Sequence, residues 1–160
     1  MTLHELNAAA RADALDAMLR CCGAHRWAEA MVAARPFATR EELLHAAEQA
    51  ADQLGDADWL EAFAAHPRIG ERSESGWSQR EQAAALNAEE SMKQQIARGN
   101  AEYEAKFGFI FIVFASGKQP EQILALLESR MRNERKIEIA KAAAEQRQIT
   151  RSRLLKLLES

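Results

Sequence analysis

The chain has 160 residues, of which 48% are hydrophobic, and its formal net charge is −3. This length predicts one domain, residues 1–160, around one hydrophobic core. Acidic and basic residues are mixed without a basic stripe, which argues against nucleic acid as a partner. No apolar stretch approaches the roughly 20 residues that span a bilayer, and the first residues show no signal-peptide pattern, so we expect a soluble intracellular protein with no membrane partner.

The first 65 residues have the periodicity and punctuation of short helices. Two pairs at capping-box spacing, Thr2 with Glu5 and Thr39 with Glu42, predict helix starts. Asp58 is predicted to cap the last helix of this half. The helices are expected to begin near Thr2 and to cover residues 10–22, 27–34, 39–54 and 59–65.

The rest of the chain is also predicted to be mostly helical. Pro67 disfavours helical geometry at His66, so a helix is expected to end there and a loop to run to Ser78. Gly99 is predicted to end the next helix and Asn100 to cap a short one. Further helices are expected over residues 79–98 and 100–107, then from Pro120 onward, and finally over residues 133–158 with Asn133 as its cap. The fold class is therefore all-α, a bundle of about seven to nine helices.

One segment, Phe109–Ala115, breaks the helical pattern. Its seven apolar residues include aromatic and β-branched side chains, which favour extended chain. It has no evident partner strand, so its main-chain N–H and C=O groups need other partners, and a polar ligand is one option. A buried helix is the alternative, because periodicity cannot decide for a run without polar residues.

His66 is the histidine that stands out, because it lies at a predicted helix end beside Pro67. There its ring can project into a cleft and titrate near neutral pH. The alternative role is to cap the preceding helix. The other histidines, His4, His25 and His45, fall within or beside amphipathic helical segments and are expected on the surface or in packing.

Ser78, Glu81 and Gln82 lie on one side of a predicted first helical turn. Ser-x-x-Glu is also a capping box, so both side chains could serve the helix alone. In a functional role, the N–H groups and dipole of this helix end would attract an anionic substrate that Glu81 and Gln82 face.

Arg153 lies near the end of the last predicted helix, after Arg147 and Arg151. Cations are favoured near a helix C-terminus, which is the simplest explanation for all three. An inward-turned guanidinium could instead hold a carboxylate or ureido group through two hydrogen bonds.

The chain carries an ordered set of short motifs, which are His66-Pro67, Ser78-x-x-Glu81-Gln82, Tyr103-x-x-x-Phe107-Gly108-Phe109-x-Phe111, Arg130-Met131-x-Asn133, Glu138 and Arg153-Leu154. In this order and spacing the set resembles the OHCU decarboxylases, which act on 2-oxo-4-hydroxy-4-carboxy-5-ureidoimidazoline (OHCU) in the uric acid pathway. The resemblance runs over nearly the whole chain.

This resemblance implies an all-helical homodimer that decarboxylates a small ureido-imidazoline to (S)-allantoin without cofactor or metal. His66 and Glu81 match the catalytic acid/base positions. The substrate-binding positions matched are Pro67, Ser78, Gln82, the main chain around Val113 and Phe114, and Arg153. Two departures, Ile110 where many members have proline and a short loop over residues 68–77, bear on pocket geometry more than on the reaction.

Two other classes of function remain open. A metal-dependent hydrolase would use His66 and Glu81 as ligands, but a third ligand at a recognisable spacing is missing. A non-catalytic helical module that binds small molecules or other proteins would explain the helical pattern but not the polar cluster. The adjacent Cys21 and Cys22 suit neither a disulfide nor a C-x-x-C site, and the final Ser160 completes no S-K-L signal, so we expect reduced thiols and a cytoplasmic location.

Overall fold

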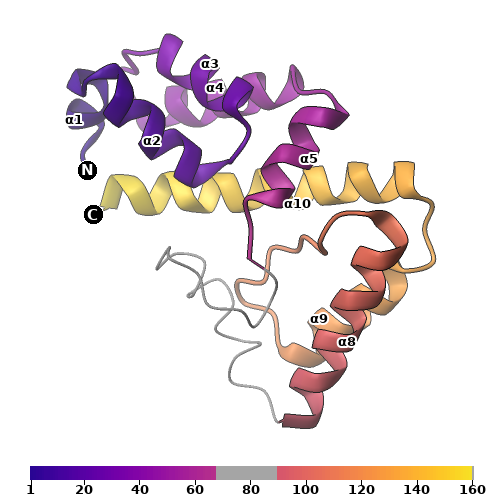
Figure 1. Cartoon of the computed structure of the whole chain (residues 1–160). Helices are drawn as coiled ribbons and strands as arrows, with labels where there is room; N and C mark the ends of the chain where they lie inside the picture. Colours follow the sequence, from indigo (N-terminus) through magenta and orange to yellow (C-terminus); the bar gives the residue numbers. More distant parts are fainter. Residues whose placement is uncertain (68–89, 160) are drawn as a thin grey trace. The chain divides into compact units, whose positions relative to one another are not determined.

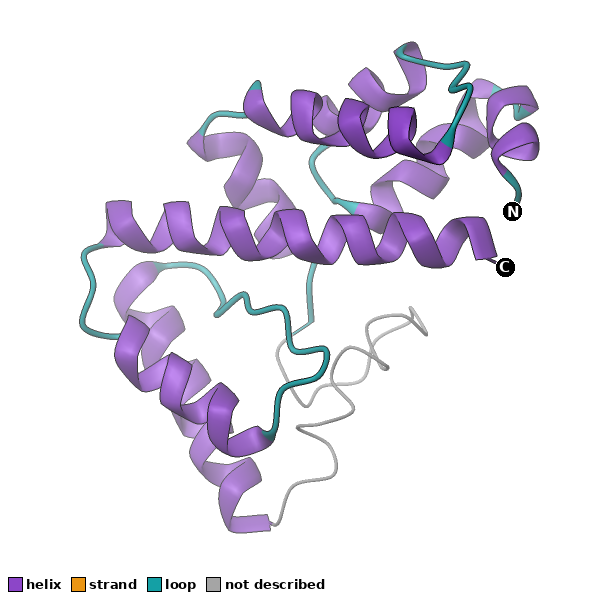
Figure 2. Cartoon of the chain, turned by 180° about the vertical axis from the view of Figure 1, so that it is seen from behind, coloured by secondary structure: helices purple, strands orange, loops and turns teal. Residues whose placement is uncertain are grey.

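The computed structural model describes residues 1–67 and 90–159, and all regular secondary structure in these ranges is helical (Figures 1 and 2). This confirms the all-α prediction. None of the described helices is long and apolar enough to cross a membrane. The helices are α1 (Leu3–Ala8), α2 (Arg11–Cys21), α3 (His25–Ala33), α4 (Arg40–Asp52), α5 (Asp56–Ala64), α8 (Glu90–Phe107), α9 (Pro120–Arg130) and α10 (Arg135–Glu159).

The contacts group the chain into two compact units. The first unit comprises Met1–Ala65 and Gln146–Ser160, and the second comprises His66–Glu145. Helix α10 contributes residues to both. One domain over residues 1–160 stays a prediction.

The first unit is built from α1 to α5 and the C-terminal part of α10, with α3 packed against both α2 and α4. Each helix turns its apolar side chains inward, as amphipathic periodicity requires. The indole of Trp27 is buried and donates a hydrogen bond to the Ala47 carbonyl at 3.1 Å. The largest fully buried apolar side chains here are Leu6, Met18, Trp27, Met31, Leu43, Phe63 and Leu154.

Local capping explains where the first helices begin. At α1, the Thr2 hydroxyl accepts from Glu5 N and the Glu5 carboxylate accepts from Thr2 N, so the predicted capping box is confirmed. At α4, the Thr39 hydroxyl accepts from Glu42 N at 3.1 Å, but the Glu42 carboxylate accepts from Ala38 N instead of Thr39 N. Both threonines therefore satisfy a helix donor that would otherwise lack a partner.

The predicted start of α5 is wrong by three residues. The helix begins at Asp56 with Gly55 as its N-cap, and the Asp58 carboxylate accepts from Gly55 N at 3.0 Å. Asp58 therefore lies in the first turn, where a carboxylate is favoured by the helix dipole. The predicted end is confirmed, since α5 stops at Ala64, before His66 and Pro67.

Gly23 allows the chain between α2 and α3 to lie against the end of α5. A Cβ atom placed on Gly23 would lie 2.5 Å from the Cβ of Ala65. Because both atoms are attached directly to backbone, Gly23→Ala is expected to cost about 1–3 kcal/mol of folding free energy through forced backbone shifts. Urea unfolding of the variant measures this loss. Gly55→Ser is the control, because its new Cβ would meet nothing closer than 4.0 Å and serine is also a favoured N-cap for α5. An equal loss in both variants would contradict the packing explanation.

The second unit contains α8, α9 and the N-terminal part of α10, and α8 packs along α9. The predicted helix break at Gly99 is wrong, because α8 runs continuously from Glu90 to Phe107 (Figure 1). A Cβ on Gly99 would overlap the Leu127 side chain of α9. Glycine thus serves close helix packing here, and its helix-breaking tendency of about 1 kcal/mol is overridden by tertiary contacts.

Asn100 and Asn133 were both predicted as helix caps, and neither is one. Asn100 lies inside α8, where its buried side-chain amide has no hydrogen-bond partner among the described residues. The Asn133 amide donates to the Glu138 carboxylate at 2.7 Å, and α10 begins two residues later, at Arg135. Asparagine can serve either as a helix cap or as a buried hydrogen-bonding residue, so only tertiary contacts distinguish the two roles.

Candidate active site

His66 and Pro67 follow α5 at a bend, and both are half-buried. The proline thus has the predicted effect of ending helical geometry before it. Ser78, Glu81 and Gln82 lie outside the described residues, so their predicted proximity to His66 stays a prediction.

The segment between α8 and α9, residues 108–119, is irregular along its whole length (Figure 2). Gly108 has a φ of 81°, a conformation that strongly favours glycine, and its N–H donates to the Glu104 carbonyl at 2.8 Å as α8 ends. The preference for non-helical chain over Phe109–Ala115 is therefore confirmed, and the buried-helix alternative is wrong. None of the described residues pairs with it as a strand.

Side chains of the second unit form hydrogen bonds to three main-chain groups of this segment. The Arg130 guanidinium donates to the Ile112 carbonyl at 2.5 Å. The Phe114 N–H donates to the Glu145 carboxylate at 3.3 Å, and the Phe114 carbonyl accepts from Lys118 Nζ at 2.7 Å. Protein side chains thus provide part of the hydrogen bonding that the sequence left open to a ligand.

Val113 lies between the hydrogen-bonded Ile112 carbonyl and the hydrogen-bonded Phe114 N–H. Its side chain is buried, yet its own N–H and carbonyl make no hydrogen bond to the described residues. These two groups are therefore one donor and one acceptor that an amide or ureido group could pair with.

A buried charged cluster of Tyr103, Arg130, Asn133 and Glu138 lies against this segment, and Arg130 connects the two. Glu138 is fully buried and Arg130 is 6% exposed, and the two form an ion pair at 2.8 Å. The same carboxylate oxygen accepts from the Tyr103 hydroxyl at 2.6 Å, and the other accepts from Asn133 at 2.7 Å. Both carboxylate oxygens are thus hydrogen-bonded, as a buried ion requires.

Aromatic rings surround this cluster. Tyr103 contacts Phe107, Phe109 and Phe111 with ring centroids 4.5, 5.8 and 5.3 Å away. The Arg130 guanidinium lies 4.6 Å from the centroid of the Phe111 ring, in cation–π range. Burial and the hydrogen bond to Glu138 raise the pKa of Tyr103, so its hydroxyl remains a proton-bearing donor at neutral pH.

The sequence missed the role of this cluster. Tyr103, Arg130 and Glu138 belong to the family pattern without a predicted task, and Asn133 was predicted only as a helix cap. Glu145 and Lys118 were not singled out at all. A buried arginine and an exposed one have the same sequence signature on a helix, so the signal that could have found them is only the spacing Arg130-Met131-x-Asn133 followed by Glu138.

Arg153 lies in the first unit and is only 7% exposed, and its guanidinium donates to the Arg20 carbonyl at 3.3 Å. This burial favours the inward-turned alternative over a solvated helix-end cation. Arg147 instead forms ion pairs with Glu48 at 2.6 Å and Asp52 at 2.9 Å, so it holds α10 to α4. Arg151 is exposed. The three arginines therefore have different environments.

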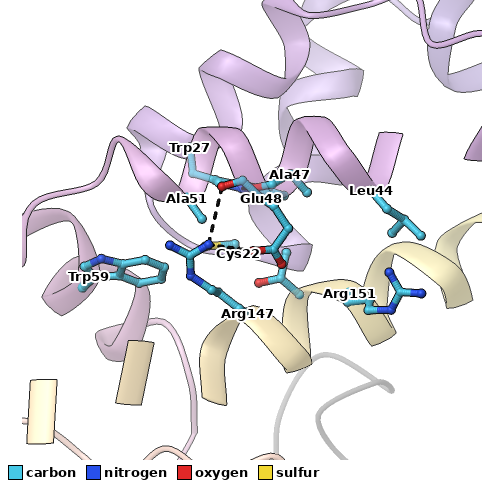
Figure 3. Close-up of a pocket in the computed structure, with 10 residues that line it drawn as sticks. Cys22, Trp27, Leu44, Ala47, Glu48, Ala51, Trp59, Arg147 and Arg151 are labelled. Atoms are coloured by element: carbon cyan, nitrogen blue, oxygen red, sulfur yellow. Dashed lines mark hydrogen bonds and ion pairs between the residues drawn. The ribbon is translucent and has the colours of Figure 1, made fainter. Parts of the chain in front are cut away.

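Figure 3 shows a pocket of the first unit in which Arg147 points toward Glu48, with Trp59 beside it and Cys22 behind. The cavity measures about 20 Å³, room for one water molecule. Burial raises the pKa of the Cys22 thiol, so this cysteine is not an activated nucleophile. The pocket is too small for an imidazoline, and none of the predicted site residues lines it.

A model of the family described as OHCU decarboxylase matches residues 7–155. The uric acid degradation bifunctional protein TTL of Arabidopsis thaliana is 37% identical over 86% of this chain, which spans 45% of that protein's length. A 2-oxo-4-hydroxy-4-carboxy-5-ureidoimidazoline decarboxylase of Haloferax volcanii is 31% identical, over 83% of this chain and 81% of its own.

Solved structures agree with these relatives. A crystal structure of an OHCU decarboxylase in the presence of (S)-allantoin has a TM-score of 0.81 and 36% identity, over 91% of this chain and 99% of that one. The class defined by fold and sequence is thus that of the all-helical decarboxylases of uric acid degradation. The chain belongs to the OHCU decarboxylase family.

Proposed function

We propose that this protein decarboxylates 2-oxo-4-hydroxy-4-carboxy-5-ureidoimidazoline to (S)-allantoin, without a cofactor. The observation that carries the proposal is the family match over residues 7–155, together with the likeness to a decarboxylase structure obtained with (S)-allantoin. The half-buried His66 after α5 and the Val113 main chain with its unused donor and acceptor are suited to such a substrate.

The substrate chemistry explains why no cofactor is required. Loss of carbon dioxide leaves an electron pair, and the adjoining imine of the ring can accept it. The substrate thereby provides the electron sink that other decarboxylases obtain from a bound cofactor. The protein has to bind and orient the substrate and to move protons.

His66 and Glu81 are the proposed acid/base pair. Neutral His66 would hydrogen-bond the substrate hydroxyl, or take its proton, as the carboxylate leaves. Glu81 would then handle the proton transfer that sets one face of the new stereocentre. Acid/base steps of this kind contribute about 10² to 10⁴-fold each, so positioning must supply much of the remaining acceleration. Glu81→Gln should therefore retain the fold and lose most turnover.

Arg153 is proposed to bind the substrate, with Pro67, Ser78, Gln82 and the main chain near Val113 and Phe114. Its burial gives a guanidinium that is shielded from water and suited to bind a carboxylate or ureido oxygen. Arg153→Ala is expected to raise KM about tenfold or more with a smaller change in kcat, because a charged hydrogen bond is worth about 1.5–3 kcal/mol. Steady-state kinetics checks this, with exposed Arg151→Ala as control. An unchanged KM would remove Arg153 from the site.

The reaction itself can be tested by generating the unstable substrate in place from urate with the upstream enzymes. Circular dichroism then follows the optically active product. A rapid signal of (S)-allantoin that depends on this protein supports the proposal. Only slow formation of racemic product would contradict it and favour a non-catalytic binding module, whereas loss of activity on adding a chelator would favour a metal-dependent hydrolase.

We also propose a homodimer in the cytoplasm, on the strength of the resemblance. Light scattering of the purified protein measures its mass, and a monomeric mass at micromolar concentration would contradict the dimer. Localisation of a tagged chain in its own cell would test the second point.

A further inference from the structure

We propose that Arg130 and Glu145 are positioning residues that orient two successive peptide units, so that the Val113 N–H and carbonyl face the ureido-imidazoline ligand. This inference rests on the proposed function. It assigns a task to a buried charged cluster that the acid/base mechanism does not use.

The first step is the direction of the peptide between Ile112 and Val113. Resonance makes this peptide planar and it is trans, so its C=O and N–H point in opposite directions. Arg130 binds the Ile112 carbonyl at 2.5 Å. The Val113 N–H must then point away from Arg130, on the side opposite the buried cluster.

The next peptide unit is held in the same way. The Phe114 N–H donates to the Glu145 carboxylate at 3.3 Å, so the Val113 carbonyl in that unit points away from Glu145. With both units held, Val113 keeps its N–H and carbonyl unpaired among the described residues. A fixed donor and acceptor on one residue can pair with the N–H and C=O of a ureido group or a cyclic amide.

Arg130 is itself held rigidly, which an orienting residue requires. Its Nε donates to Glu138 at 2.8 Å, and its guanidinium also lies within 3.4 Å of the Tyr103 hydroxyl. The planar guanidinium of Arg130 thus donates to the Glu138 carboxylate from one edge and to the Ile112 carbonyl from another. Lysine has a single ammonium group and cannot reproduce this geometry. The charged donor on the carbonyl also polarises the peptide and strengthens the Val113 N–H as a donor.

The test compares Arg130→Lys with the wild-type protein by two measurements. In the ligand-free protein, the ¹⁵N-resolved amide signal of Val113 should shift, because the Ile112–Val113 peptide loses the guanidinium that orients it. (S)-allantoin should then bind about fivefold to tenfold more weakly, the expected effect of one misdirected hydrogen bond. KM should rise more than kcat falls. An unchanged Val113 amide, or unchanged binding, would overturn the proposal.

Loss of stability alone must be separated from loss of orientation. Ile123→Val shortens a fully buried side chain of α9 while leaving Arg130 in place, so it should lower stability without shifting the Val113 amide or weakening (S)-allantoin binding. An equal weakening in this control would overturn the proposal.

If Arg130→Lys fails to fold, Glu145→Ala replaces it, because Glu145 is half-buried on α10 and alanine favours helix. That variant should shift the Phe114 amide and weaken binding, and no change in either would count against the proposal. If the wild-type protein makes no (S)-allantoin, the proposed function fails, while the ligand-free amide signals still decide whether Arg130 orients this peptide.

Discussion

His66→Asn is expected to remove most of the turnover while leaving the fold intact. Asparagine keeps a hydrogen-bonding group of similar reach but cannot exchange a proton near neutral pH. The rate should fall by about 10² to 10⁴-fold, the usual contribution of one acid/base group. His66 is half-buried at a bend and lies outside α5, so the free energy of unfolding should change by no more than about 1 kcal/mol.

Two measurements check this expectation. Circular dichroism of the product formed in place gives the rate, and urea unfolding gives the stability. His45→Asn is the matched control, because it makes the same change at an exposed position of α4 and should leave turnover as it is. A near-normal rate in His66→Asn would exclude the proposed role. A fall in rate accompanied by a large loss of stability would assign His66 a structural role.

Arg130→Met is expected to produce the largest loss of stability. The change leaves the fully buried Glu138 carboxylate without its cation and the Ile112 carbonyl without its donor. Breaking one side of a buried ion pair costs about 3–5 kcal/mol, because the remaining charge is desolvated without compensation. Urea unfolding followed by far-ultraviolet circular dichroism measures this loss. Arg132→Met, the same change at an exposed residue two positions later, should cost no more than about 0.5 kcal/mol.

The double variant Arg130→Met with Glu138→Leu tests whether charge explains the loss. Removing both partners eliminates the uncompensated ion, so the double loss should be smaller than the sum of the two single losses by about 1–3 kcal/mol. Additive losses would show that packing, and not the ion pair, accounts for the effect.

Local sequence predicted the starts and stops of several helices correctly. Thr2 and Thr39 cap α1 and α4, Pro120 begins α9, and Pro67 follows the end of α5 as expected. These signals succeed because each acts through the donors and dihedral angles of a few neighbouring residues. The extended character of Phe109–Ala115 was predicted for the same reason, from the preference of its own side chains.

The errors share a different cause. Gly99 lies inside a helix because Leu127 of another helix requires the space, and Asn133 turns to Glu138 instead of capping. In each case a residue with a local preference is used by a partner distant in the sequence. Such pairings depend on which helix faces cover one another, and no single stretch of sequence contains that information.

The candidate site divides in the same way. The sequence by itself determined the helical class, the break at His66 and Pro67, and, through a family resemblance, the residues proposed to act on substrate. Only the tertiary structure showed that Arg153 is buried, that Arg147 forms an ion pair with α4, and that Arg130 donates to the Ile112 carbonyl. The physical reason is that composition and spacing specify which groups a chain carries, whereas burial and partnership arise only when distant segments pack and exclude water.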